Sequence, residues 1–182
     1  KDLNEEMRAI LIDWLVDVHN KFKLRPETLF LTINIIDRYL GKVIILRTQL
    51  QLLGITALFI ASKYEEIHPP EINDCVYITD NTYSKDEVIR MECSIVRKLD
   101  FCLSFASPYL ILQRLIRISG MEKQDFFVCQ YFLELSFLDY AQLVYKPSIL
   151  ASAAVYFVRK LRGYDVAWPE SLELTTHISS SE

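Results

Sequence analysis

The stretch from Leu52 to Glu66 (LLGITALFIASKYEE) constrains the fold more than any other part of this chain. Its first ten residues carry no charge and are apolar on almost every side of a helix, which is typical of a helix that is buried on most sides. Small residues at Gly54, Ala57 and Ala61 recur at helical spacing and would let neighbouring helices approach closely. We therefore expect a central helix around which the other helices pack.

This helix is expected to end at a charged tip near the surface. The residues Lys63 to Glu66 change its character abruptly, and a Pro-Pro pair follows at 69 and 70. Proline stops the helix because it lacks the backbone N–H and restricts the residue before it. Thr48 and Gln51 have the spacing of a capping box at the other end. Ten apolar residues are too few to cross a bilayer.

Apolar stripes at helical spacing, with capping residues or prolines at their starts, predict the other helices. The expected helical ranges are 4–20, 27–40, a short segment within 69–76, 84–99, 108–118, 123–140, 147–163 and a short helix that opens at 168–169. A loop is expected at 77–82. Because no strand is expected, the predicted fold class is all-α.

An internal repeat relates the two halves of the chain. A shift of 97 residues places Gly54 on Ala151 and Ala57 on Ala154, and it also places Lys63 on Lys160. Both segments are small-residue-rich helices preceded by two others, which indicates two copies of one all-helical unit.

The repeat predicts two domains, at residues 1–103 and 104–182. The first holds five helices, and the second is expected to be truncated near its fourth. The chain opens on Lys rather than Met and ends on Ser-Ser-Ser-Glu, so we expect a fragment of a longer protein.

Charged residues interrupt several of the apolar stripes. Arg8 lies in register with the stripe of the first helix, and Asp37 lies in register with that of the second. Because a buried charge is costly unless it is paired, we predict an ion pair between them. Glu92 lies on the apolar side of its helix, and Lys63 could pair with it. A pair at a surface end could be structural or could be a point of recognition.

The apolar arc of the first helix is wider than one packing face needs. Met7, Ile10 and Trp14 lie beside the main stripe. They are either buried against further helices or exposed as a groove for a partner peptide. Periodicity alone favours burial.

Composition and motifs argue against several classes of function. The net charge of −4 differs from the basic balance of many nucleic-acid binders. The four cysteines form no C-x-x-C pair and the three histidines are scattered, so neither a metal site nor another cofactor is expected. The cysteines are expected to be reduced and mostly core fillers.

Nucleotide-binding and hydrolase motifs are absent from the sequence. The adjacent Glu65 and Glu66 would point about 100° apart on a helix, so they would make a poor acid–base pair. The residues alone therefore predict a helical binding protein and no enzyme.

Several segments together resemble the cyclin box. They are MRAILIDWL (Met7–Leu15), IIDRYL (Ile35–Leu40), LQLLGITALFIASKYEEIHPPEI (Leu50–Ile72), ITDNTYSKDEVIRME (Ile78–Glu92) and KLDF (Lys98–Phe101). Two more segments, FLELSFLDY (Phe132–Tyr140) and PSILASAA (Pro147–Ala154), resemble the second box of mitotic cyclins. SKYEE followed by PPEI, together with FLELSFLDY, is closer to cyclin B than to cyclin A.

The resemblance implies two tandem five-helix cyclin folds, the second apparently truncated. It also implies a regulatory subunit that binds and activates a cyclin-dependent protein kinase and has no catalysis of its own. By this similarity, one set of residues would contact the kinase: Lys63, Tyr64, Glu66, Glu92, Val96, Phe101 and Leu103.

The resemblance also implies a second site, a groove that recruits substrates and inhibitors bearing a short basic-hydrophobic motif. Its residues would be Met7, Ile10, Leu11, Trp14, Asp17 and Gln51. Asp17 stands where relatives often carry Glu, so its reach towards a basic residue is shorter. The Arg8–Asp37 pair would be the structural bridge of the fold.

The resemblance to mitotic cyclins implies a role in the cell cycle near the G2/M transition. It also implies a location in the nucleus and cytoplasm. Neither nucleic acid nor a membrane is expected as a partner. Two alternatives stay open: a general transcription factor built on the same fold, and a helical scaffold without a kinase partner. An electrophoretic shift assay with DNA would separate the first alternative from the others.

Overall fold

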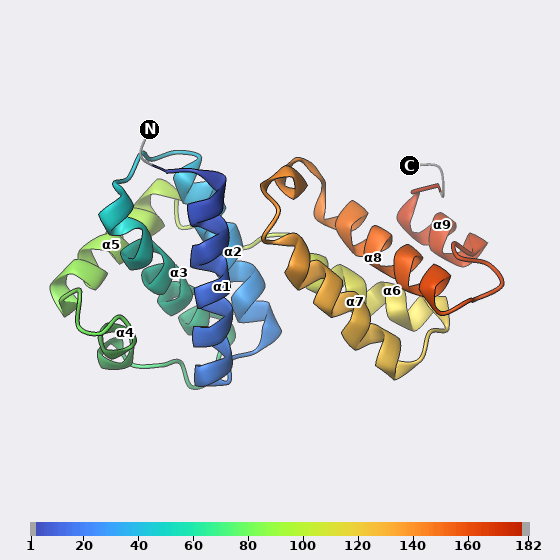
Figure 1. The fold of residues 1–182 in the computed structure, drawn as a ribbon, viewed down its shortest axis with the longest axis horizontal. Coiled ribbons are helices and arrows are strands. Elements are labelled where there is room, and N and C mark those ends of the chain that lie inside the picture. The colour runs from blue at the N-terminus through green and yellow to red at the C-terminus, as the bar shows by residue number, and fades with distance from the viewer. Residues whose placement is uncertain (1–2, 180–182) are drawn as a thin grey trace. The chain divides into compact units, whose positions relative to one another are not determined.

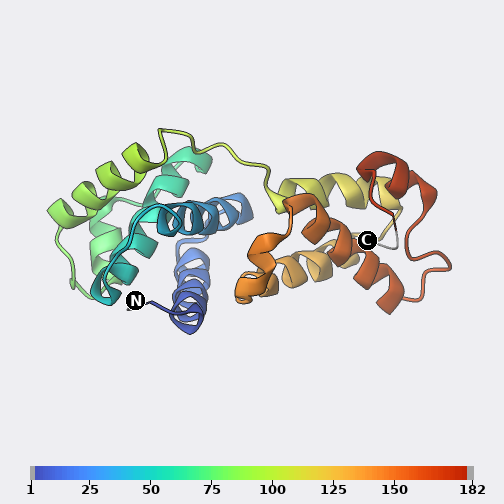
Figure 2. The same ribbon diagram turned by 90° about the horizontal axis from the view of Figure 1, so that it is seen from above.

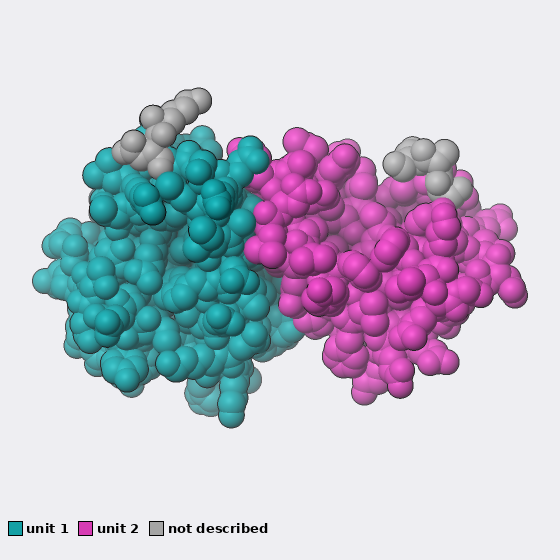
Figure 3. Space-filling view, in the orientation of Figure 1, with its two compact units in different colours: residues 1–105 teal, residues 106–182 magenta. Residues whose placement is uncertain are grey.

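The structure, a computed structural model, describes residues 3–179. In this part of the chain every regular element is helical, with nine α-helices and two short 3-10 helices (Figure 1), as the sequence predicts. The chain divides into two compact units, unit 1 (Lys1–Phe105) and unit 2 (Ala106–Glu182) (Figure 3). Each unit has its own core and is described by itself.

Unit 1 is built around one central helix. Its α-helices are α1 (Glu5–Phe22), α2 (Pro26–Leu40), α3 (Leu50–Glu65), α4 (Ile72–Ile78) and α5 (Lys85–Lys98). Helix α3 contacts the other four (Figures 1 and 2). A Cβ atom added to Gly54 would lie 2.7 Å from Cδ1 of Leu11, so α1 packs on α3 at a distance that only glycine permits. The predicted central helix is therefore confirmed.

The starts of the helices in unit 1 follow local chemistry, with one exception. Oδ1 of Asn4 accepts the N–H of Met7 at 2.8 Å, and Ser84 and Glu87 cap α5 reciprocally. The predicted capping box at Thr48 is wrong. Helix α3 instead begins at Leu50 as the continuation of a 3-10 turn, η1 (Arg47–Gln49), which supplies its first hydrogen bonds.

Unit 2 holds four α-helices in the described residues: α6 (Pro108–Ser119), α7 (Lys123–Ser136), α8 (Pro147–Leu161) and α9 (Glu170–Thr176). Helix α8 packs against α6 and α7, and α9 packs against α6. Gly120 ends α6 with a φ of +65°, a left-handed conformation that glycine adopts without steric cost.

One prediction about unit 2 is wrong in detail. Helix α7 ends at Ser136 rather than at Tyr140, and the N–H of its C-cap residue Phe137 donates to the carbonyl of Glu134 at 3.1 Å. Asp139 then caps a separate 3-10 turn, η2 (Tyr140–Val144). Ser107 occupies the N-cap position of α6, but its hydroxyl makes no capping bond.

Candidate functional site

An ion pair joins the C-terminal end of α3 to α5. Nζ of Lys63 donates to Oε1 of Glu92, and 40% and 22% of the two side chains are exposed. The same Nζ lies 4.1 Å from the ring centroid of Phe59. An ion pair this exposed contributes little to stability, so the two polar groups are available to a partner.

Apolar side chains lie near this pair along the chain: Tyr64 follows Lys63 on α3, Val96 lies one turn after Glu92 on α5, and Phe101 and Leu103 follow the end of α5. Tyr64 is 55% exposed and Phe101 is 75% exposed, while Val96 and Leu103 are half-buried against the core. Exposed aromatic rings beside a polar pair are typical of a protein-binding surface. The Lys63–Glu92 pair and these four apolar residues are called the α3–α5 surface below.

The turn after α5 places Phe101 at the surface. Asp100 and Phe101 both have positive φ values, 54° and 57°. Lys42 holds the turn, because its Nζ donates to the carbonyl of Lys98 at 2.9 Å and lies 3.6 Å from Oδ2 of Asp100. This exposure of Phe101 is therefore built into the fold of unit 1.

Glu66, which was predicted beside these residues, is engaged within the chain. Its Oε1 accepts the N–H of Arg25 at 2.7 Å and the hydroxyl of Thr28. Sequence reasoning missed both partners, because they lie about forty positions earlier and no apolar register marks them.

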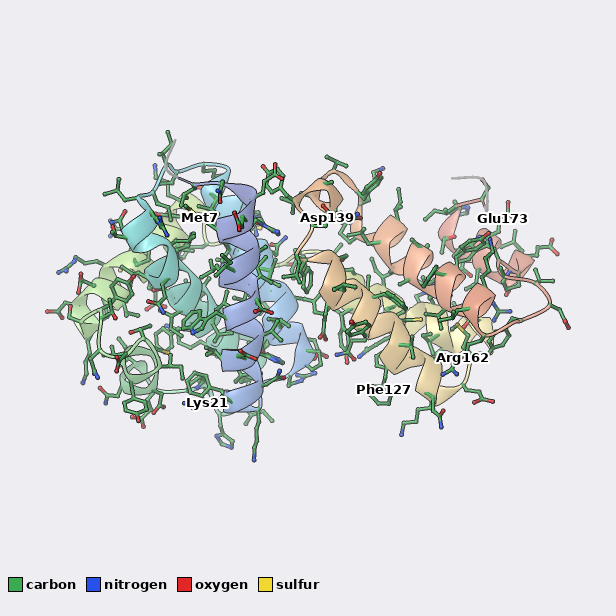
Figure 4. The ribbon with its side chains drawn as sticks, viewed as in Figure 1. Met7, Lys21, Phe127, Asp139, Arg162 and Glu173 are labelled. Carbon is green, nitrogen blue, oxygen red and sulfur yellow. The ribbon has the colours of Figure 1, made fainter. Side chains whose placement is uncertain are left out.

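The predicted α1 groove residues differ in exposure. Ile10 is 63% exposed, whereas Leu11 is 5% exposed and packs over Gly54. Asp17 is exposed, and Gln51 is half-buried at the start of α3. The remaining two, Met7 and Trp14, are half-buried against the core (Figure 4 labels Met7 on α1). Leu11 therefore serves the core, and the others reach the surface in part. We call the five residues other than Leu11 the α1 surface.

Arg8 and Asp37 form a bidentate ion pair between α1 and α2. Nε of Arg8 donates to Oδ1 at 2.7 Å, and Nη2 donates to Oδ2 at 2.8 Å. Arg8 is only 6% exposed. Two parallel charge-assisted bonds of this kind fix the geometry as well as the charge.

Sequence reasoning missed a polar network in unit 2. Asp125 is 4% exposed and accepts from Nε of Arg162 and from the hydroxyl of Tyr164, both at 2.9 Å (Arg162 is labelled in Figure 4). Burial first, and then the bond to Asp125, raise the pKa of Tyr164. The signal was present, because Asp125 stands in register with the buried Cys129 and Leu133.

Arg159, whose guanidinium lies close to Tyr164, donates its hydrogen bonds to backbone carbonyls. Nη1 of Arg159 donates to the carbonyl of Ser119 at 2.6 Å, and Nη2 donates to the carbonyl of Val166 at 3.0 Å. Its guanidinium carbon lies 4.3 Å from the ring centroid of Tyr164. These contacts tie α8 to the end of α6.

The thiols fall into two groups. Cys75 and Cys129 are buried, and burial raises the pKa of each to about 12. Cys93 and Cys102 are exposed, so the expectation that the cysteines mostly fill the core holds for only two of them. Within residues 3–179 there is no cluster of metal-binding side chains, and no helix there is long and apolar enough to cross a membrane.

Known families account for both units. The family described as "Cyclin, N-terminal domain" matches residues 1–104, and "Cyclin, C-terminal domain" matches residues 101–182. The chain belongs to the cyclin family. The predicted resemblance to mitotic cyclins is confirmed by relatives aligned along the whole chain. The G2/mitotic-specific cyclin-1 of Antirrhinum majus is 49% identical over 100% of this chain and 38% of its own length. Cyclin-B1-3 of Arabidopsis thaliana is 44% identical over 100% and 44%.

Solved structures agree on the fold. A viral cyclin from herpesvirus saimiri superimposes with a TM-score of 0.87 at 18% identity, over 98% of this chain and 80% of the viral one. A chain of the CAK complex of Chaetomium thermophilum bound to ATP-gamma-S gives a TM-score of 0.64 at 17% identity, over 98% and 59%. The chain spans about two fifths of the length of the mitotic relatives named above.

Proposed function

We propose that this chain binds and allosterically activates a cyclin-dependent protein kinase. Membership of the cyclin family and relatives named as G2/mitotic-specific and B-type cyclins support this proposal. The observation that carries it is the α3–α5 surface, where the Lys63–Glu92 pair lies beside exposed aromatic rings. The chain acts as a regulatory subunit and catalyses nothing itself.

The chemistry of this surface suits a helix and loop of a partner. Lys63 carries three N–H donors, and one of them is directed at Glu92. The remaining donors, together with the carboxylate of Glu92, can bond backbone groups of the partner. Tyr64 and Phe101 supply the large apolar contacts that dominate the energy of such interfaces.

The mechanism of activation is a shift of population in the kinase. An active kinase needs the ion pair between its own strand lysine and the glutamate of its C helix. A surface that binds only the state with this helix turned inward favours that state. To move the kinase from 1% to 99% active, the chain must bind the active state roughly 10⁴-fold more tightly. A rigid surface meets this demand because little conformational entropy is lost on binding, and α3 contacts all four other α-helices of unit 1.

The α1 surface is proposed to recruit substrates and inhibitors with a basic-hydrophobic motif. Ile10 offers exposed apolar area, and the exposed Asp17 offers a negative charge about two turns later on α1. An apolar residue of the motif would pack beside Ile10 and Trp14, and a basic residue would face Asp17. We place this activity in the nucleus and cytoplasm, near the G2/M transition.

Reconstitution tests the kinase proposal. The chain is mixed with a panel of monomeric cyclin-dependent kinases, each phosphorylated on its activation loop, and histone phosphorylation is measured. We expect strong activation of at least one kinase. Binding and activation of none, with the helical circular dichroism spectrum intact, would contradict the proposal and favour the scaffold or the DNA-binding alternative.

Substitution of Trp14 tests the recruitment proposal. Trp14→Ala is expected to leave phosphorylation of a minimal peptide unchanged and to slow phosphorylation of a substrate that carries the motif. An equal loss with both substrates would contradict a recruiting role for the α1 surface.

A further inference from the structure

Three helix ends of unit 1 meet at Arg25, which bonds the residues that follow Lys63 and Tyr64 at the end of α3. Arg25 is the N-cap residue of α2. Its carbonyl faces Nε2 of His19, on the last turn of α1, at 2.9 Å. Its guanidinium Nη1 donates to the carbonyl of Glu65 at 3.4 Å, and its N–H donates to Glu66. The ends of α1 and α3 and the start of α2 are thereby joined.

Glu66 supplies the acceptor that the start of α2 lacks. The side chain of Arg25 makes no capping bond of its own to α2. Oε1 of Glu66 instead accepts the N–H of Arg25 at 2.7 Å and the hydroxyl of Thr28 at 2.5 Å. A carboxylate at this position is also favoured by the positive end of the helix dipole.

The same residue closes α3. Glu66 is the C-cap of α3, and its N–H donates to the carbonyl of Ser62 at 2.9 Å. Lys63 and Tyr64 lie in the turn that this cap closes. The last turns of helices fray readily when few contacts hold them, so a side chain anchored on α2 holds this turn in place.

We propose that Glu66 is a positioning residue for the α3–α5 surface, acting through Thr28 and Arg25 rather than by touching the kinase. This inference rests on the proposed function. It assigns a different role to Glu66 from the direct contact that family resemblance implies.

Thr28 discriminates between the two roles because it is fully buried, with 0% exposure. No partner can reach its hydroxyl. A loss of kinase affinity on removing that hydroxyl therefore has to pass through Glu66. A direct contact by Glu66 alone would leave hydrogen exchange of the Lys63 and Tyr64 amides in the free chain unchanged when that hydroxyl is removed.

The experiment compares four variants: Thr28→Val, Thr28→Ser, Glu66→Ala and the double variant Thr28→Val/Glu66→Ala. Thr32→Val is the matched control. Thr32 lies one turn further along α2 and is equally buried, and its hydroxyl donates to the carbonyl of Thr28 at 2.7 Å rather than to Glu66. For each variant we would measure Kd for the kinase that the wild-type chain binds most tightly in the panel. Hydrogen exchange of the backbone amides of Lys63 and Tyr64 would be measured in the free chain.

If Glu66 positions the surface, Thr28→Val weakens kinase binding about 5- to 10-fold, the size of one ordinary lost hydrogen bond. The double variant is then no weaker than Glu66→Ala, because both changes break one interaction. Exchange of the Lys63 and Tyr64 amides accelerates, Thr28→Ser restores wild-type values, and Thr32→Val changes neither readout.

The proposal is overturned if the wild-type chain binds its kinase and Thr28→Val binds equally well, whatever Glu66→Ala does. It is also overturned if the amides of Lys63 and Tyr64 exchange at wild-type rates in Thr28→Val. Failure of the proposed function looks different, because the wild-type chain itself then binds no kinase in the panel.

Discussion

Units 1 and 2 place similar helices in different surroundings. In unit 1, eleven of the sixteen residues of α3 are buried, whereas six of the fifteen residues of α8 are buried in unit 2. Ile60 of α3 is 3% exposed, but Phe157, which the repeat places at the same position, is 49% exposed. Phe157 makes an edge contact with Phe132 of α7, with ring centroids 4.9 Å apart. A row of small residues thus permits close packing, and the helices that surround it decide how much becomes core.

The two units also treat buried charge differently. Arg8 of unit 1 is neutralised by one carboxylate in bidentate geometry. Arg159 of unit 2 is equally buried but is held by backbone carbonyls and a tyrosine ring. The buried arginine of unit 1 is therefore held by a bidentate charge pair, whereas the buried arginine of unit 2 is held by several neutral contacts.

The chain carries a reporter for each unit. It has two tryptophans, Trp14 in unit 1 and Trp168 in unit 2. A Trp168→Phe background follows unfolding of unit 1 by fluorescence, and a Trp14→Phe background follows unit 2. The stability predictions below use urea titration in these two backgrounds.

The largest effect is expected from Asp37→Ala. This change leaves the buried Arg8 without its carboxylate, so unit 1 should lose about 3–5 kcal/mol of unfolding free energy. Asp125→Ala in unit 2 should cost less, because its partner Arg162 has a side chain that is 47% exposed and can be hydrated. Equal losses in the two units would contradict the expectation that hydration of Arg162 offsets the loss of Asp125.

A smaller effect is expected where α1 meets α3. In Gly54→Ala the new methyl would lie 2.7 Å from Cδ1 of Leu11, and unit 1 should lose about 1–3 kcal/mol through overpacking. The counterpart in unit 2 already carries a methyl at Ala151. The reverse change there, Ala151→Gly, should cost about 1 kcal/mol through helix propensity. An unchanged midpoint for Gly54→Ala would show that α1 can move away without cost.

The pH dependence of Tyr164 sharpens the comparison within unit 2. Folding raises the pKa of Tyr164. The contribution of Tyr164 to the free energy of unfolding is therefore fully present below the pKa of the unfolded chain, near 10, and is lost as pH rises through the pKa of the folded chain. Tyr164→Phe should therefore destabilise unit 2 by about 1 kcal/mol at pH 8, and the gap to wild type should close above pH 10. A gap that stays constant to pH 11 would show that the hydroxyl bond to Asp125 is unimportant.

The smallest effect is a difference in rate between two buried thiols. With Cys93→Ser and Cys102→Ser in place, Cys75 reports opening of unit 1 and Cys129 reports opening of unit 2. Both should react slowly with a disulfide reagent at pH 8, since both are buried and burial raises their pKa to about 12. Cys129 lies on α7, which packs against α8, and Cys75 lies on α4, which packs against α3. Cys129 should react faster than Cys75, because α8 is covered less completely than α3. A faster reaction of Cys75 would show that unit 1 opens more readily than unit 2.

Much of the fold could be predicted from sequence because helix starts are local events. Asn4 and the pair Ser84 and Glu87 cap their helices as predicted, and Pro26 opens α2. The errors came where two local signals compete. Thr48 had the spacing of a capping box, but a 3-10 turn took the first hydrogen bonds of α3.

The candidate site was predictable in part, for a related reason. Arg8 and Asp37 were paired from helical register, and Lys63 was named as a possible partner of Glu92 from its place at the charged end of its helix. The bonds from Arg25 and Thr28 to Glu66 join segments that no periodic pattern relates, so they needed the structure.

The most direct test of the central claim is the affinity of the double variant Lys63→Ala/Glu92→Ala for the activated kinase, measured by calorimetry. We predict that binding weakens while the circular dichroism spectrum and the urea midpoint of unit 1 stay close to wild type, because so exposed a pair contributes at most about 1 kcal/mol to folding. An unchanged Kd would contradict the claim that the α3–α5 surface binds the kinase.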